Sequence, residues 1–115
     1  MVTMKLVQAI IKPNKLDDTK EALVALGVKG MTVTHVKGFG RQPGQTEVYR
    51  GAEYEVAYVS KIKIEVLIED DLLPKVSKTI QLKARTGEIG DGKIFITHIE
   101  GVTRIRTGES GRDAI

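Results

Sequence analysis

The chain has 115 residues, 41% hydrophobic and 29% charged, with a formal net charge of +3 at neutral pH, which fits one domain with a single hydrophobic core. It contains no cysteine, which excludes disulfides, thiolate metal sites and cysteine nucleophiles. We expect a cytoplasmic protein, since no apolar run has the length of a membrane span or the shape of a signal peptide, and the mild basicity favours anionic small ligands over dedicated nucleic-acid binding.

The beginning of the chain predicts a strand, a helix and a second strand. Residues 4–12 are almost continuously apolar and β-branched, which is typical of a strand buried on both faces. A helix is expected next, with Asn14 or Asp17 as its N-terminal cap and Gly27 closing it in the left-handed conformation. Residues 31–37 are β-branched and predict the second strand.

A long loop is expected at residues 39–58, where the hydrophobic periodicity disappears. The stretch exceeds the usual length of a connection in a compact domain, and such loops are mostly functional or disordered. Its composition favours function, because it is rich in side chains used in recognition: Arg41, Gln42, Glu47, Tyr49, Arg50, Glu53 and Tyr54.

A third strand and a second helix follow the loop. Residues 61–68 alternate between apolar and mostly charged positions, so one face of the strand is expected in the core. The helix is expected to begin at about Leu72 after a cap at Asp70 or Asp71, and to stop at Gly87.

Two short strands are expected near the end, at residues 93–99 and 102–106. The resulting order, β-α-β-β-α-β with a small extra strand, predicts a ferredoxin-like α+β fold with an antiparallel sheet and two helices on one face. We interpret residues 1–115 as a single domain with a C-terminal segment at about 102–115.

Residues 86–93, with the sequence T-G-E-I-G-D-G-K, form a glycine-rich stretch between the second helix and the next strand. Glycine lets the backbone approach a ligand, successive amides can bind an anion, and Lys93 adds a cation. The Walker spacing is absent. A phosphate-binding turn and a simple helix end followed by a tight turn are both compatible with this pattern.

Several charged side chains could join such a site. Arg104 and Arg106 are two residues apart on a predicted strand and would share a face, as would Lys61, Lys63 and Glu65. For both groups, an ordinary solvated strand face is the commoner explanation of such a pattern.

Residues 38–42 form a second glycine cluster, in which Gln42 could complete a magnesium shell or bond its own backbone. Tyr54 suits protein contact or covalent modification, and His35 and His98 are interpreted as packing or surface residues. The sequence shows no nucleophile elbow and no zinc-protease motif, which favours ligand binding over catalysis.

Four segments together resemble one known family. Residues 37–42 (K-G-F-G-R-Q), 46–54 (T-E-V-Y-R-G-A-E-Y), 86–95 (T-G-E-I-G-D-G-K-I-F) and 104–109 (R-I-R-T-G-E) closely resemble the PII nitrogen-regulatory signalling proteins. The resemblance implies a compact homotrimer that is not an enzyme. It also implies a nucleotide site in each cleft between subunits, where ATP and ADP compete.

The resemblance assigns roles residue by residue. Glu65 would lie beside the nucleotide site, and the nucleotide-binding residues would be Thr32 and Leu67 at the base, with Arg41, Gly90, Asp91, Gly92, Lys93, Arg104, Ile105 and Arg106. The residues that bind 2-oxoglutarate, together with Mg²⁺-ATP, would be Gly40, Gln42, Gly44 and Lys61. Gln42 would also coordinate the metal.

The long loop resembles the T-loop of this family. Arg50 matches the arginine that enters an ammonium channel, and Tyr54 matches the tyrosine that a nucleotidyltransferase uridylylates or adenylylates. Pro43 stands where a lysine is common and Ala52 where one branch has a phosphorylated serine. The expected function is therefore control of ammonium channels or nitrogen-assimilation enzymes in response to ATP, ADP and 2-oxoglutarate.

Two alternatives use the same scaffold. One is a nucleotide-binding phosphotransferase with His98 or His35 as nucleophile. The other is an RNA-binding module, for which Phe95 is the available aromatic residue on a predicted strand.

Overall fold

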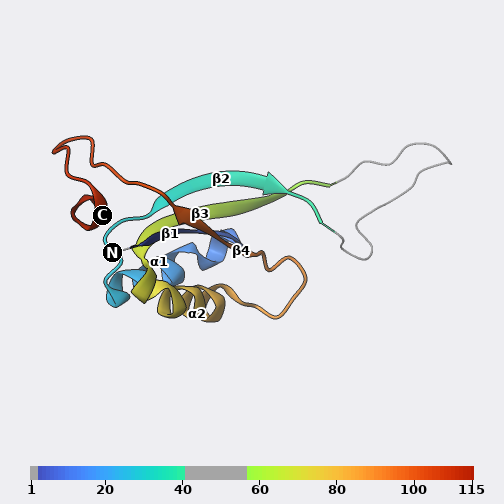
Figure 1. Ribbon diagram of the computed structural model, residues 1–115. Helices are drawn as coiled ribbons and strands as arrows, with labels where there is room; N and C mark the ends of the chain where they lie inside the picture. The colour runs from blue at the N-terminus through green and yellow to red at the C-terminus, as the bar shows by residue number, and fades with distance from the viewer. Residues whose placement is uncertain (1–2, 41–56) are drawn as a thin grey trace, which may run out of the picture.

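The computed structural model describes residues 3–40 and 57–115. Its elements in chain order are β1 (Met4–Ile11), α1 (Leu16–Leu26), β2 (Thr32–Gly38), β3 (Val59–Glu69), α2 (Leu73–Ala84) and β4 (Ile94–Ile99). Short 3-10 turns lie at Pro13–Lys15, Asp70–Leu72 and Gly111–Ala114. The β-α-β-β-α-β order confirms the ferredoxin-like α+β fold (Figure 1).

The strands form one antiparallel sheet in the order β2-β3-β1-β4, and both helices lie on the same face of it (Figure 1). β2 and β4 are therefore the edge strands. β2 and β3 are paired from Thr32↔Glu65 as far as Gly38↔Val59, so the two ends of the long loop start side by side.

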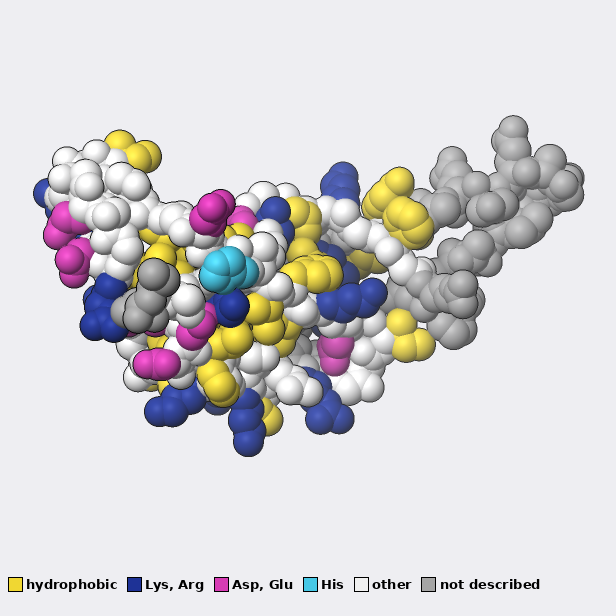
Figure 2. All heavy atoms as spheres, in the orientation of Figure 1, with side chains coloured by type: hydrophobic (Ala, Val, Ile, Leu, Met, Phe, Trp, Pro, Cys, Tyr) yellow, Lys and Arg dark blue, Asp and Glu magenta, His cyan; other side chains and the backbone are white. Residues whose placement is uncertain are grey.

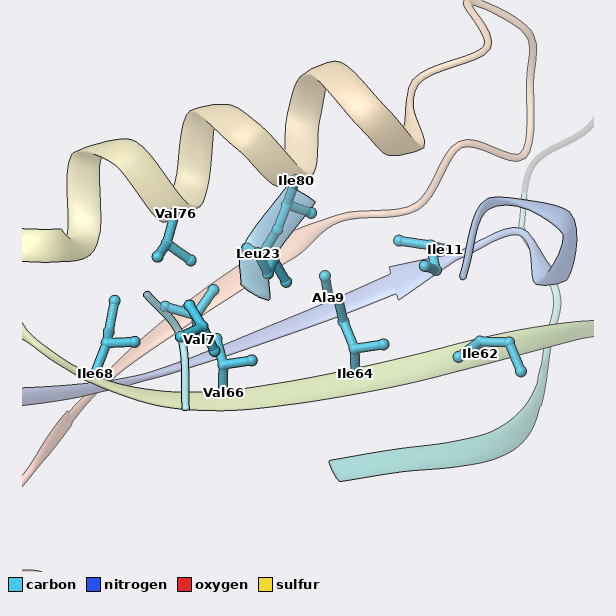
Figure 3. Close-up of a cluster of buried hydrophobic side chains, with 11 residues drawn as sticks. Val7, Ala9, Ile11, Leu23, Ile62, Ile64, Val66, Ile68, Val76 and Ile80 are labelled. Atoms are coloured by element: carbon cyan, nitrogen blue, oxygen red, sulfur yellow. The ribbon is translucent and has the colours of Figure 1, made fainter. Parts of the chain in front are cut away.

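The core lies between the sheet and the helices (Figure 3). Alternate residues of β1 and β3 point toward the helices, because side chains on a strand alternate between faces. The buried residues of the core are Val7, Ala9, Ile11, Leu23, Val28, Ile62, Ile64, Val66, Ile68, Val76 and Ile80. The alternation predicted for residues 61–68 is confirmed.

Within residues 3–40 and 57–115, no helix covers the other face of the sheet, so the prediction that β1 is buried on both faces is wrong. Leu6, Gln8 and Ile10 alternate with the core residues of β1 and are only half-buried. On the same face at the β4 edge, Phe95, which pairs with Gln8, is 48% exposed. Figure 2 shows hydrophobic side chains at the surface in the region of β4.

The first helix differs from expectation at its start. A 3-10 turn comes first, α1 begins at Leu16, and neither Asn14 nor Asp17 caps it. The Thr19 hydroxyl instead donates to the Lys15 carbonyl oxygen at 2.7 Å, within the first turn. The expected ending is confirmed, since Gly27 is left-handed with φ 102°.

The second helix begins within one residue of the expected start but ends earlier than expected. Asp70 and Asp71 belong to a 3-10 turn and do not cap α2, which begins at Leu73. It ends at Ala84, because Arg85 is already extended, so Gly87 lies in the loop beyond the helix.

Residues 102–106 do not form the extra strand that their alternation predicts. Their pairing is limited to one bridge between Thr103 and Ser110. The backbone bonds locally instead: the Arg104 amide donates to the Glu109 carbonyl at 2.8 Å, and the Gly108 amide donates to the Arg104 carbonyl at 2.8 Å. A turn therefore satisfies the polar groups that a strand would have presented to a neighbour.

Among the described residues, neither helix has the length and apolar character needed to cross a bilayer.

Candidate ligand-binding site

The loop between α2 and β4 is closed by the side chain of Asp91. Its Oδ2 accepts hydrogen bonds from the amides of Thr86 and Gly87, each at 2.8 Å, and its Oδ1 accepts one from the Thr86 hydroxyl at 2.6 Å. Gly87 and Gly90 have φ of 85° and 103°, values that L side chains rarely adopt, so glycine permits this path.

The charge of Asp91 is stabilised by these contacts. The hydrogen bond from the Thr86 hydroxyl lowers the pKa of Asp91 most. Burial opposes this effect, and the two amides and Lys12 lower the pKa further, so it lies well below its ordinary value of 3.8. Lys12 Nζ lies 3.6 Å from Asp91 Oδ1 and donates to the Thr86 hydroxyl at 3.0 Å.

Gly92 brings the loop against the end of β1. A Cβ at this position would lie 1.7 Å from the Ile10 carbonyl oxygen, so a side chain cannot fit without moving backbone. The Ile10 amide donates to the Lys93 carbonyl at 3.0 Å and joins the loop to β1. This position therefore requires glycine for a steric reason, not for a positive φ.

A cavity of about 370 Å³ opens between this loop and the end of the β2–β3 hairpin. Lys61 reaches across it, and its Nζ donates to the Gly90 carbonyl oxygen at 2.5 Å. The cavity is lined by Ile10, Gly38, Phe39, Gly40, Val59, Lys61, Ile89, Gly90, Asp91, Gly92, Lys93 and Phe95. Two ammonium groups and glycine backbone at one cavity give it the chemistry of an anion site.

A second cavity, of about 340 Å³, lies at the other end of β3. Thr32, Glu65 and Leu67 line it together with Leu6 and the end of the chain at Ala114 and Ile115. Gln8 donates to Glu65 at 3.0 Å and holds this carboxylate on the open sheet face. The residues predicted to contact a nucleotide base therefore do lie together.

The predicted pair of arginines on one strand face is wrong. Ile105 and Arg106 lie in a turn and are exposed, with Ile105 fully so. The Arg104 guanidinium turns toward the C-terminal residues, where its Nη2 donates to the Ile115 carbonyl oxygen at 3.0 Å. Arg104 thus lies beside Ile115, one of the residues that line the cavity at the Leu67 end of the sheet.

Most of the predicted nucleotide and 2-oxoglutarate residues that the structure describes therefore fall into two groups within one chain. The first group is the loop at Gly90–Lys93 with Lys61 and Gly40, and the second is Thr32, Leu67 and Arg104. Figure 1 shows the loop after α2 and the C-terminal segment at opposite ends of the sheet.

Five predicted residues lie outside the described part of the chain: Arg41, Gln42, Gly44, Arg50 and Tyr54. His35 and His98 are exposed, as a surface interpretation expects, and His98 Nδ1 lies 3.5 Å from Lys5 Nζ.

Lys12 and Thr86 are part of the loop structure but do not stand out in the sequence as functional residues. A hydroxyl side chain five residues before an aspartate in a glycine-rich loop is the signal that points to Thr86. Lys12 is placed by the end of β1, a contact that depends on the tertiary fold.

Comparisons with known proteins agree with the fold and the motifs. Residues 4–109 match the family model described as Nitrogen regulatory protein P-II. The Nitrogen regulatory protein P-II of Azospirillum brasilense is 62% identical over 112 residues, covering 97% of this chain and 100% of the relative. That of Haemophilus influenzae is 54% identical with the same coverage.

Solved structures show the same relationship. Arabidopsis thaliana PII bound to citrate superposes with a TM-score of 0.82 at 38% identity, covering 98% of this chain and 92% of that one. B. subtilis GlnK gives 0.82 at 34% identity, covering 98% and 99%. The relatives are named as regulatory proteins, which favours a regulator over a phosphotransferase. The chain belongs to the P-II family of nitrogen regulatory proteins.

Proposed function

We propose that this P-II protein senses ATP, ADP and 2-oxoglutarate and controls an ammonium channel or a nitrogen-assimilation enzyme through residues 39–58. It acts by binding and not by catalysis. Magnesium enters with the nucleotide phosphates and is completed by Gln42, while Arg50 contacts the partner and Tyr54 is the candidate for nucleotidylation.

The separation of the two residue groups carries this proposal. Lys61 and Leu67 are six positions apart on β3, which corresponds to about 20 Å. Gly90–Lys93 lie at the Lys61 end and Arg104 at the Leu67 end, yet both are expected to contact nucleotide phosphates. The triphosphate of a nucleotide is far shorter than this span. One copy of the protein therefore cannot supply both groups of residues to the phosphates of the same nucleotide.

A site shared between copies resolves this difficulty. The cavity at Gly90–Lys93 of one copy would face the cavity at Thr32 and Leu67 of the next, so that phosphates meet the first and the base meets the second. We propose a homotrimer, which closes such a head-to-tail contact into a ring.

The uncovered sheet face supports assembly. Leu6, Ile10 and Leu67 are half-buried on it, and Phe95 is 48% exposed at its edge. Apolar side chains on an uncovered face are typical of a protein contact surface.

The Lys61 cavity suits a dicarboxylate. Its ammonium group is a fixed cation at the base of the β2–β3 loop, where Gly40 also lines the wall. The Arabidopsis relative is bound to citrate, a polycarboxylate, which is compatible with carboxylate binding in this fold. A ligand here would lie next to residues 39–58 and could change the surface that they present to a partner.

Calorimetric titration with ATP and ADP, each with and without 2-oxoglutarate and Mg²⁺, tests the proposal, with light scattering to give the mass. We expect a trimer that binds both nucleotides competitively, and 2-oxoglutarate binding that requires Mg²⁺-ATP. A monomer that binds neither nucleotide at millimolar concentration would contradict it.

A further inference from the structure

We propose that Asp91 is a positioning residue that fixes the shape of the loop at residues 86–93 through Thr86 and does not contact the nucleotide itself. This inference rests on the proposed nucleotide function of that loop. It replaces the sequence-based expectation that every residue from Gly90 to Lys93 is a ligand contact.

The carboxylate of Asp91 is already committed within its own chain. Both oxygens accept hydrogen bonds from Thr86 or Gly87, at distances of 2.6 to 2.8 Å. Lys12 lies 3.6 Å from Oδ1 and partly compensates the charge. A carboxylate held this way has its oxygens engaged by donors of its own loop, and its negative charge would repel an incoming anion.

The Thr86 hydroxyl is fully used in the same network. It donates to Asp91 at 2.6 Å and accepts from the Glu88 amide at 3.1 Å and from Lys12 Nζ at 3.0 Å. A hydroxyl has one hydrogen to donate and two lone pairs, so all of its capacity is taken. Residues 86–91 are thereby closed into a ring whose polar groups point inward.

The closure leaves other amides of the loop for a ligand. Among the described residues, the amides of Gly90 and Gly92 are donated to no hydrogen-bond acceptor. Lys61 holds the Gly90 carbonyl, and Gly92 is pressed against Ile10, so both glycines are fixed in place. Asp91 lies between them and sets their direction by joining the loop back to Thr86.

Substitution of Asp91 distinguishes a purely electrostatic role from a positioning role, because the two roles change nucleotide affinity in opposite directions. If only charge mattered, Asp91→Asn would remove a negative group near the phosphates and tighten nucleotide binding. If Asp91 positions the loop, the same change weakens binding, because an amide side chain cannot accept all three hydrogen bonds.

The test uses three variants of the full-length protein: Asp91→Asn, Thr86→Val and Thr86→Ser. Each variant is titrated with Mg²⁺-ATP. Without nucleotide, the rate of amide hydrogen exchange at residues 86 and 87 is measured for each. Thr86→Val removes the hydroxyl at nearly constant size, and Thr86→Ser retains it. Lys93→Ala is the comparison that removes a cation from the cavity but leaves the ring of hydrogen bonds intact.

We expect Asp91→Asn and Thr86→Val to weaken Mg²⁺-ATP binding about tenfold and to speed exchange at Gly87, since the ring opens. Thr86→Ser should restore most of both properties. Lys93→Ala should weaken binding and leave exchange at Gly87 unchanged, which distinguishes a ligand contact from a positioning role.

Unchanged or tighter binding by Asp91→Asn would overturn the proposal, as would weaker binding with unchanged exchange at Gly87. If Asp91→Asn fails to fold, the comparison of Thr86→Val with Thr86→Ser decides in the same way. If the wild-type protein binds no nucleotide, the proposed function fails, and the exchange measurement alone still decides whether Asp91 holds the loop.

Discussion

The Arg104 guanidinium donates a hydrogen bond to the Ile115 carbonyl oxygen at 3.0 Å, and Ile115 lines the cavity formed by Thr32 and Leu67. The end of the chain therefore occupies one donor of a side chain proposed to bind phosphate. Arg112 holds this segment to β3, with its Nε 2.6 Å from Glu69 Oε1.

Arg112→Ala should tighten Mg²⁺-ATP binding about two- to fivefold, because a loosened C-terminal segment competes less well for Arg104. Stability should change by less than about 1 kcal/mol, since the pair with Glu69 is exposed. Calorimetric titration and thermal unfolding check the two parts.

Lys78→Ala is the matched control for that prediction, because it removes the same charge from an exposed position on α2. It should leave ATP affinity nearly unchanged. Equal behaviour of the two variants would show that the C-terminal contact has no effect on the nucleotide.

Lys61→Ala should abolish 2-oxoglutarate binding and retain much of the ATP affinity, because it removes the ammonium group that would pair with a carboxylate. Lys63→Ala serves as control, since Lys63 lies two residues along the same sheet face and does not line the cavity. Titration with 2-oxoglutarate at saturating Mg²⁺-ATP gives the answer, and normal affinity in Lys61→Ala would refute the assignment.

Gly92→Ala should lower stability by about 1–3 kcal/mol and weaken ATP binding, because the new Cβ would collide with the Ile10 carbonyl and push the loop off β1. Gly101→Ala tests the same chemical change where nothing lies within 4 Å, and it should be nearly neutral. Denaturant unfolding of both variants compares them. Equal stability would mean that the loop moves freely.

Acidification should reveal the stabilising contribution of Asp91. Its pKa lies below the ordinary value of 3.8, so its ionised form stabilises the fold above about pH 4, and this stability is lost as the pH falls below that value. The difference in unfolding free energy between wild type and Asp91→Asn should be constant from pH 5 to 7, as rough bounds, and shrink below about pH 4. A difference independent of pH down to the acid limit would contradict this.

Ile80→Ala should destabilise the fold by about 2–5 kcal/mol, because Ile80 is 1% exposed in the core between α2 and the sheet. Leu82→Ala, on the same helix, should cost much less, since Leu82 is 64% exposed. Urea unfolding of the two variants measures the difference, and similar losses would place the core elsewhere.

The sequence was sufficient for the element order because each element carries its own periodicity. The alternation from Ile62 to Ile68 and the left-handed Gly27 are local signals, and both are confirmed. The caps were predicted wrongly, since Asp17 and Asp70 are good N-caps by composition while 3-10 turns take that place in the structure.

The other wrong predictions concern features that depend on contacts between distant parts of the chain. The alternation of residues 102–106 resembles a strand, but a strand needs a partner, and the local turn at Gly108 satisfies the backbone instead. Likewise the apolar run of β1 predicts two buried faces, although both helices cover only one in the single chain. The resemblance places Gly90 and Arg104 in one nucleotide site, and only the fold reveals that Gly90 lies at the Lys61 end of β3 while Arg104 bonds Ile115 at the Leu67 end.

The pairing of Gly38 with Val59 means that whatever chain connects them leaves and re-enters the domain through neighbouring positions. Doubling the length of a flexible connection between such fixed points costs only about 0.6 kcal/mol in closure entropy. The scaffold can therefore accept a longer, shorter or wholly different connection at this point while its interior stays the same.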